Sequence, residues 1–191
     1  MRVNIYGIYK NIRDASWHCL AEYRISKLPV DVLEIARISN VKIIKNSSVN
    51  MLSLSESGVS VFDGDGWYII YNDKNTIQRT RFTIAHELGH IFLGHELRKG
   101  YHARTFDTNR PQVEREADSF AARLLAPACV LWGLNLRSAE EISAVCNISL
   151  AAAKIRAERM AILYSRNKFL TSPLERAVYD NFREYIKASR L

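Results

Sequence analysis

The sequence predicts an α+β fold in which helices accompany a small antiparallel β-sheet and an all-helical region follows. Three short apolar runs, at 41–44, 59–62 and 67–71, are typical of strands. On both sides of these runs the apolar residues recur with the helical period of about 3.6. With 191 residues, of which 48% are hydrophobic and 25% charged, the chain can bury one core, or one core with a small appendage.

The elements up to the sheet follow a simple order. Apolar residues at helical spacing predict helices over 11–25 and 30–38, ahead of the first strand. Asp63-Gly64-Asp65-Gly66, between the last two strands, predicts a hairpin turn. The same residues superficially suggest a calcium loop, but the rest of that ligand pattern is missing, which favours the turn. The edge strand of such a sheet is a place where an extended peptide can add as a further strand.

The helix predicted over 76–92 carries the sequence His86-Glu87-Leu88-Gly89-His90. Residues four apart share one face of a helix, with Cβ atoms about 5–6 Å apart, so both imidazoles can reach one metal ion. Glu87 lies beside them, where it can take a proton from a metal-bound water. The motif therefore predicts a zinc site with His86 and His90 as ligands and Glu87 as the general base.

A catalytic zinc ion needs a third protein ligand, and the nearest candidate is His95. The metzincin pattern would require glycine and histidine where this chain has Leu93 and Glu96, so that pattern is excluded. His95 follows His86 by nine residues, about half a turn round a continuing helix. We therefore expect His95 to point away from the metal, as an ordinary polar residue at a helix end.

The helix predicted over 113–125 offers a better ligand. Glu114 and Asp118 are four residues apart on a face that borders the apolar stripe, so both can turn inward. Without the histidine motif, this spacing would indicate a solvated charged face of the helix. With the motif, a zinc ion and a zinc-bound histidine supply the partners that two buried carboxylates need. We assign Glu114 as the third ligand and Asp118 as the acceptor that holds one histidine ring in its tautomer. Glu116 lies roughly 200° from Glu114 round the helix and is expected in solvent.

Two segments together resemble the ImmA/IrrE family of metallopeptidases. Residues 81–90 are similar to that family's RFTxAHELGH stretch. Residues 114–127 are similar to its ExEANxFAAxLLMP segment, with Asp118 for the usual Asn and Ala126 for the usual Met. The resemblance covers about 28–165 and implies a zincin-like fold of the gluzincin type, with one Zn²⁺ held by two histidines and a glutamate. It also implies a cytosolic endopeptidase that acts on helix-turn-helix transcriptional repressors.

A polar segment at 100–111 joins the two helices that carry the metal ligands. Tyr101 and His102 lie in this segment, and either side chain could stabilise the oxyanion of a tetrahedral intermediate or contact the substrate. Loop tyrosines and histidines more often have no such role.

The chain becomes all-helical towards its C-terminus. We predict a zincin-like peptidase domain over 1–134 and a helix-turn-helix-like region over 135–191. The last 41 residues carry a net charge of +5 out of +7 for the chain. Arg156 and Arg159 could meet DNA phosphates there, whereas a pair of helices that only packs, with a solvated surface, explains the same pattern.

Nothing in the sequence indicates export. No apolar run approaches the roughly 20 residues of a membrane span, and the first residues lack a signal-peptide core. Cys19, Cys129 and Cys146 are widely spaced and odd in number, so we expect reduced thiols in a cytoplasmic protein.

Two functions are therefore in competition. The first is a zinc endopeptidase that hydrolyses a specific cytosolic protein. The alternative is a DNA- or protein-binding regulator whose zinc site is structural or vestigial. Glu87 favours the enzyme, because a purely structural site needs no base.

Overall fold

The computed structural model describes residues 11–53, 55–95 and 112–189. The chain forms two compact units, one from the residues up to Ala15 and Val32–Ala121, the other from Ser16–Asp31 and Ala122–Leu191. The first unit contains helices and a three-stranded sheet, and the second is helical. The predicted α+β fold class, with an all-helical C-terminal region, is confirmed, while the boundary at residue 134 stays a prediction.

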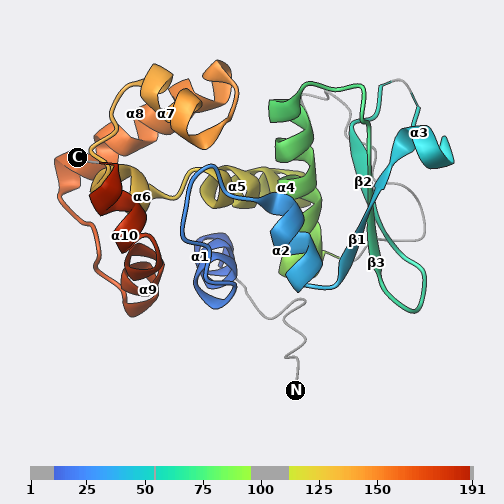
Figure 1. Cartoon of the computed structure of the whole chain (residues 1–191), viewed down its shortest axis with the longest axis horizontal. Coiled ribbons are helices and arrows are strands. Elements are labelled where there is room, and N and C mark those ends of the chain that lie inside the picture. The colour runs from blue at the N-terminus through green and yellow to red at the C-terminus, as the bar shows by residue number, and fades with distance from the viewer. Residues whose placement is uncertain (1–10, 54, 96–111, 190–191) are drawn as a thin grey trace. The chain divides into compact units, whose positions relative to one another are not determined.

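The sheet of the first unit has the order β1-β3-β2. Its strands are β1 (Val41–Lys45), β2 (Gly58–Phe62) and β3 (Trp67–Tyr71), drawn in cyan to green in Figure 1. β2 and β3 form the expected antiparallel hairpin, but β1 runs parallel to β3. The sheet is therefore mixed. The chain reverses once between β1 and β2, across the short helix α3 (Asn46–Val49), and again at the hairpin, so that β3 regains the direction of β1.

The turn of the hairpin forms as predicted. The side chain of Asp63 accepts hydrogen bonds at Oδ1 from the backbone N–H groups of Asp65 and Gly66, both at 3.0 Å. Gly64 has φ 101°, a conformation that other residues rarely adopt. The local sequence alone thus determines where the strand direction reverses.

The helix α4 (Ile77–Leu93) lies along one face of this sheet, against β2 and β3 (Figure 1). It starts at Thr76, whose side chain accepts a hydrogen bond from the backbone N–H of Arg79. It ends at Gly94, which has φ 66°. The helix α2 (Val32–Ile38) packs against α4 and β1.

The strand β2 presents different residues to its two faces, as the period of two requires. Val59 belongs to an apolar cluster with Leu52 and Ile70. Gly58 and Ser60 face α4 instead, since a Cβ on Gly58 would lie 2.4 Å from the Thr83 side chain and Ser60 bonds to a residue of α4. A small residue at 58 lets the strand approach the helix closely.

The helix α5 (Gln112–Leu125), which belongs to the first unit up to Ala121, lies against α4 there. The rings of Phe92 and Phe120 are 5.9 Å apart. A Cβ on Gly89 would meet Ala117 Cα at 3.2 Å and Phe120 Cδ1 at 3.1 Å, so the backbones of the two helices approach closely there. This close approach brings together the carboxylates of one helix and the histidines of the other.

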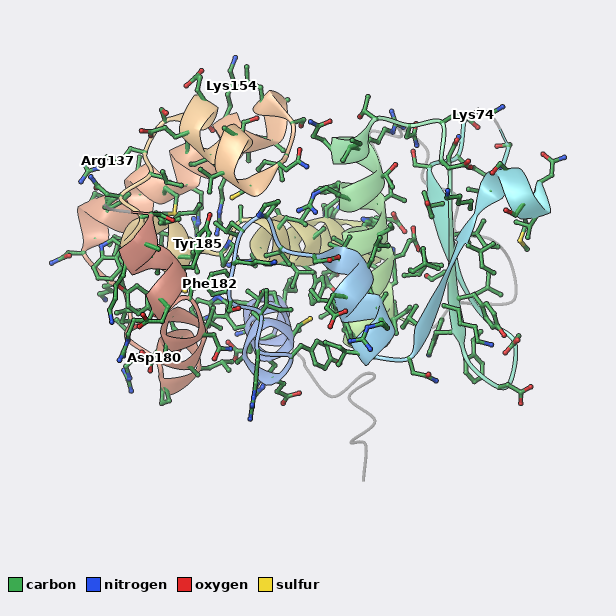
Figure 2. The ribbon with its side chains drawn as sticks, viewed as in Figure 1. Lys74, Arg137, Lys154, Asp180, Phe182 and Tyr185 are labelled. Carbon is green, nitrogen blue, oxygen red and sulfur yellow. The ribbon has the colours of Figure 1, made fainter. Side chains whose placement is uncertain are left out.

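The second unit is built from helices. They are α1 (Ile12–Glu22, in this unit from Ser16), α6 (Ala128–Gly133), α7 (Ala139–Cys146), α8 (Leu150–Arg166), α9 (Pro173–Asn181) and α10 (Arg183–Ala188). The last two helices, α9 and α10, are separated by the buried Phe182, which is labelled in Figure 2. Among the described residues, no helix combines the length and apolar character that crossing a membrane requires.

The helices α7 and α8 form the predicted helix-turn-helix pair. Ser138 and Glu141 make a reciprocal capping box at the start of α7, and Asn147 ends the helix in a left-handed conformation. On α8, Arg156 is only 9% exposed, which favours the packing alternative over phosphate contact for this residue. Arg159 is exposed, and so is Lys154, whose side chain extends away from the helices of this unit (Figure 2).

Candidate metal centre

Three predicted ligands come together on α4 and α5. His86 and His90 lie on α4 and Glu114 in the first turn of α5, and one potential ligand atom from each lies within 4.8 Å of the others. All three side chains are buried, with exposed fractions of 1%, 2% and 8%. Among the described residues this is the one group of histidine, cysteine or acidic side chains arranged to hold a metal ion.

The spacing of these atoms fits a zinc ion. The Nε2 atoms of His86 and His90 are 3.0 Å apart. Glu114 places Oε2 3.3 Å from His86 Nε2 and Oε1 3.3 Å from His90 Nε2. Zinc bonds of about 2.0–2.1 Å in a tetrahedral arrangement require ligand atoms about 3.3 Å apart. Two imidazole nitrogens and a carboxylate are also a donor set found in catalytic zinc sites.

Glu114 is held in its charged form. Burial by itself would raise the pKa of the Glu114 carboxyl, but hydrogen bonds and charge from His86 and His90 outweigh burial and lower that pKa well below its usual range. A metal ligand must be deprotonated, so the surroundings of Glu114 prepare it for a cation at neutral pH.

Asp118 contacts His86 as expected. The Asp118 Oδ1 atom lies 2.9 Å from His86 Nδ1, on the opposite side of the imidazole from Nε2. The carboxylate therefore accepts the Nδ1 proton and leaves Nε2 unprotonated, which is the tautomer that a metal ligand needs. Asp118 reaches this ring because it lies one helical turn after Glu114.

His95 lies outside the group of ligands, as expected, but it contacts one of them and is not simply a polar residue at a helix end. Its Nδ1 atom lies 2.9 Å from Nδ1 of His90. The expectation assumed that the helix continues, but α4 ends at Leu93 and Gly94 turns the chain back. The backbone N–H of His95 then donates to the carbonyl oxygen of His90 at 3.1 Å, which holds the two residues together.

Glu116 is likewise not simply solvated. Its Oε2 atom lies 3.1 Å from His95 Nε2, and its Oε1 accepts a hydrogen bond from Gln112 at 2.7 Å. The hydrogen bond from Gln112, and next the one from His95, lower the pKa of Glu116. The pKa of His95 is lowered by burial and then by the charge of His90, so His95 favours its neutral form.

The predicted general base, Glu87, turns towards β2. Its Oε2 atom accepts a hydrogen bond of 2.8 Å from the hydroxyl of Ser60, and both side chains are buried. The buried Thr83 Oγ1, one turn earlier on α4, makes no hydrogen bond. Ser60 was not predicted as a site residue. A hydroxyl residue between Val59 and Val61, in an otherwise apolar strand, was the feature of the sequence that could have indicated it.

Gly89 was also missed as a residue that shapes the site. It lies inside the motif between the two histidines, and its missing Cβ is what lets Ala117 of α5 approach. Glycine in a helix interior costs stability, so its presence at the contact between two helices indicates a packing reason.

The two proposed oxyanion residues, Tyr101 and His102, lie outside the described residues. The structure therefore brings together five predicted site residues and adds others from β2 and from the end of α4. The five are His86, Glu87, His90, Glu114 and Asp118.

Comparison with known proteins matches residues 37–158 to a peptidase family described as the IrrE N-terminal-like domain. The match spans more than half of the chain and includes α4 and α5 with the ligand set. No curated protein matches the chain.

Proposed function

Because the chain belongs to the ImmA/IrrE family of peptidases, as its two motifs predicted, we propose that it is a zinc-dependent endopeptidase. One observation carries this proposal: His86, His90 and Glu114 form a buried group that fits zinc, and the buried Glu87 directly follows His86 on the same helix. Burying three ionisable side chains together costs folding free energy, so such a cluster indicates a bound metal ion or a catalytic role.

In this proposal His86, His90 and Glu114 hold the ion. When bound, zinc supplies Lewis acidity, which activates a water and polarises the carbonyl of the scissile peptide bond. Glu87 takes the proton of the attacking water as general base and then passes it to the leaving amine. The hydrogen bond from Ser60 takes one acceptor site on Oε2 of Glu87 and leaves Oε1 available for this proton.

We propose that the substrate binds as an extended peptide along β2. Support comes from the sheet order, which leaves one side of β2 without a neighbouring strand among the described residues. Ser60 links this strand directly to the general base. A peptide that adds to the strand would use backbone hydrogen bonds for affinity and would lie beside the reacting groups.

The proposed substrate is a helix-turn-helix transcriptional repressor in the cytoplasm. Support for this class comes from the resemblance to the ImmA/IrrE family, and the protein would then regulate transcription by removing a repressor. Cleavage of a co-expressed repressor would support the proposed substrate class.

A second candidate function, DNA contact by the C-terminal helices, has one specific observation in its favour. Lys154 and Arg159 are exposed on α8. The same helix also exposes Leu150, Ile155 and Ile162, which suit a protein partner better than phosphates. The full chain with Lys154→Glu and Arg159→Glu tests this function in a mobility-shift assay. DNA binding that is salt-sensitive in the wild type and lost in the variant would support it.

The endopeptidase proposal is tested by Glu87→Gln in the full chain, co-expressed with candidate repressors. Loss of a general base removes about 10²–10⁴-fold of rate, so fragments seen by mass spectrometry with the wild type should disappear. Zinc content should stay at that of the wild type, because Glu87 is not a ligand.

Glu158→Gln provides the matched control, since Glu158 is an exposed carboxylate on α8. This variant should cleave normally. Cleavage that continues unchanged in zinc-loaded Glu87→Gln protein would refute the role of Glu87.

A further inference from the structure

The ring of His90 is contacted at both of its nitrogens. Nε2 faces His86 and Glu114, where the metal is proposed to bind. Nδ1 faces His95 at 2.9 Å, with ring centroids 5.0 Å apart and ring planes at 72°. His95 therefore lies behind His90, away from the ligand atoms, and the contact cannot be that of a fourth ligand.

The positions of the protons along this chain of contacts follow from the ligand role of His90. Its Nε2 must be unprotonated to bind a metal, so the proton is on Nδ1 and is donated to His95. His95 Nδ1 must then accept, which leaves the His95 proton on Nε2. That atom lies 3.1 Å from the carboxylate of Glu116, which accepts it. One assignment of protons thus gives a donor and an acceptor to both the His90–His95 contact and the His95–Glu116 contact.

We propose that His95 is a positioning residue for His90, and that His95 and Glu116 together fix the tautomer and the ring orientation of this ligand. The inference rests on the proposed zinc site and adds to it. The two histidine ligands then have parallel supports from α5: Asp118 contacts His86 directly, whereas Glu116 acts on His90 through His95.

The position of His95 depends on the end of α4. Gly94 takes the left-handed conformation with φ 66°, and the backbone N–H groups of Gly94 and His95 donate to Ile91 and His90. The backbone at His95 is therefore fixed by a hydrogen-bonded helix end. A residue held in this way can fix the orientation of a neighbouring ring.

The experiment measures zinc affinity of the full chain by competition with a chelator, without any substrate. His95→Phe keeps a ring of similar size and removes both nitrogens. We expect its zinc affinity to fall about 10–100-fold, as on loss of the residue that orients a metal ligand. His95→Asn keeps a side-chain oxygen able to accept from His90 and should recover most of the loss.

A second readout separates positioning from a merely structural role. Cobalt(II) in place of zinc should give a visible spectrum in His95→Phe that differs from the wild type, since the orientation of a ligand changes. Unfolding of the metal-free protein in urea should be nearly unchanged. Glu116→Ala alters a half-exposed side chain and tests the same contacts without changing His95; it should weaken zinc binding several-fold.

His18→Phe is the matched control, because it makes the same substitution at a histidine of α1. It should leave zinc affinity at the wild-type value. Wild-type affinity in both His95→Phe and Glu116→Ala would overturn the inference and leave the proposed function intact. A wild-type chain that binds no zinc would instead overturn the proposed function, and the inference with it.

Discussion

The helices α4 and α8 are alike in length and in their ends but differ in burial. Each has 17 residues, starts at a hydroxyl residue that caps its first turn, and ends at a residue in the left-handed conformation. In α4 the ten consecutive residues from Thr83 to Phe92 are buried. In α8 only Ala153, Arg156 and Met160 are buried.

This difference in burial explains why the candidate metal site lies on α4 and not on α8. A surface helix such as α8 buries one stripe and exposes its polar side chains to water. The middle of α4 is covered on every side, so its histidines and glutamate are enclosed as well and must find partners among the neighbouring residues. Those partners are Glu114 and Asp118 on α5 and Ser60 on β2.

The largest effect on stability is expected from Leu88→Ala in the enclosed part of α4. Leu88 is fully buried, and removing such a side chain costs about 2–5 kcal/mol. Urea unfolding of the metal-free protein measures the change. Met160→Ala, at a fully buried position of α8, should cost a similar amount, because burial and not the identity of the helix decides the cost. A loss below about 1 kcal/mol for Leu88→Ala would contradict the enclosure of α4.

Gly89→Ala tests the close contact between α4 and α5. Alanine favours the helix by about 1 kcal/mol, whereas crowding against Ala117 and Phe120 costs about 1–3 kcal/mol, so the net loss of stability is modest. Zinc affinity should fall more clearly, about tenfold, because α5 carries Glu114 and Asp118. Calorimetric zinc titration alongside urea unfolding separates the two effects. Unaltered zinc affinity would show that α5 adapts without moving its carboxylates.

Asp118→Ala should weaken zinc binding about 10–100-fold, because the Nδ1 proton of His86 loses its acceptor. Asp118→Asn keeps a side-chain oxygen at that place and should stay within a few-fold of the wild type. Chelator competition at one fixed pH gives both values. If both variants lose affinity equally, the charge of Asp118 matters more than the hydrogen bond.

The smallest effect is expected from Ile155→Ser on the exposed side of α8. Ile155 is 70% exposed, and substitutions at such positions change stability by no more than about 0.5 kcal/mol. Urea unfolding should therefore match the wild type. A clear loss of stability would mean that α8 is covered in the protein, and the contrast with α4 would fail.

Most helices and strands could be predicted from local pattern. The strand alternation, the Asp63–Gly66 turn and the capping box at Ser138 and Glu141 all rest on residues near one another in sequence. A local pattern predicts poorly beyond the end of its helix. His95 was placed by continuing a helix that stops at Leu93, so its contact with His90 was not predicted.

Among the site residues, His86, Glu87 and His90 were determined by the sequence itself, because spacing on one helix fixes their common neighbourhood. Glu114 and Asp118 also lie beside the two histidines, as the sequence analysis expected, while their roles as ligand and as acceptor stay predictions. Only the tertiary structure decided that Ser60 meets Glu87, that Glu116 reaches His95, that Arg156 is buried and that β1 runs parallel to β3. Each of these contacts depends on how segments that are distant in the sequence pack together. The spacing of residues within one helix or strand does not determine that packing.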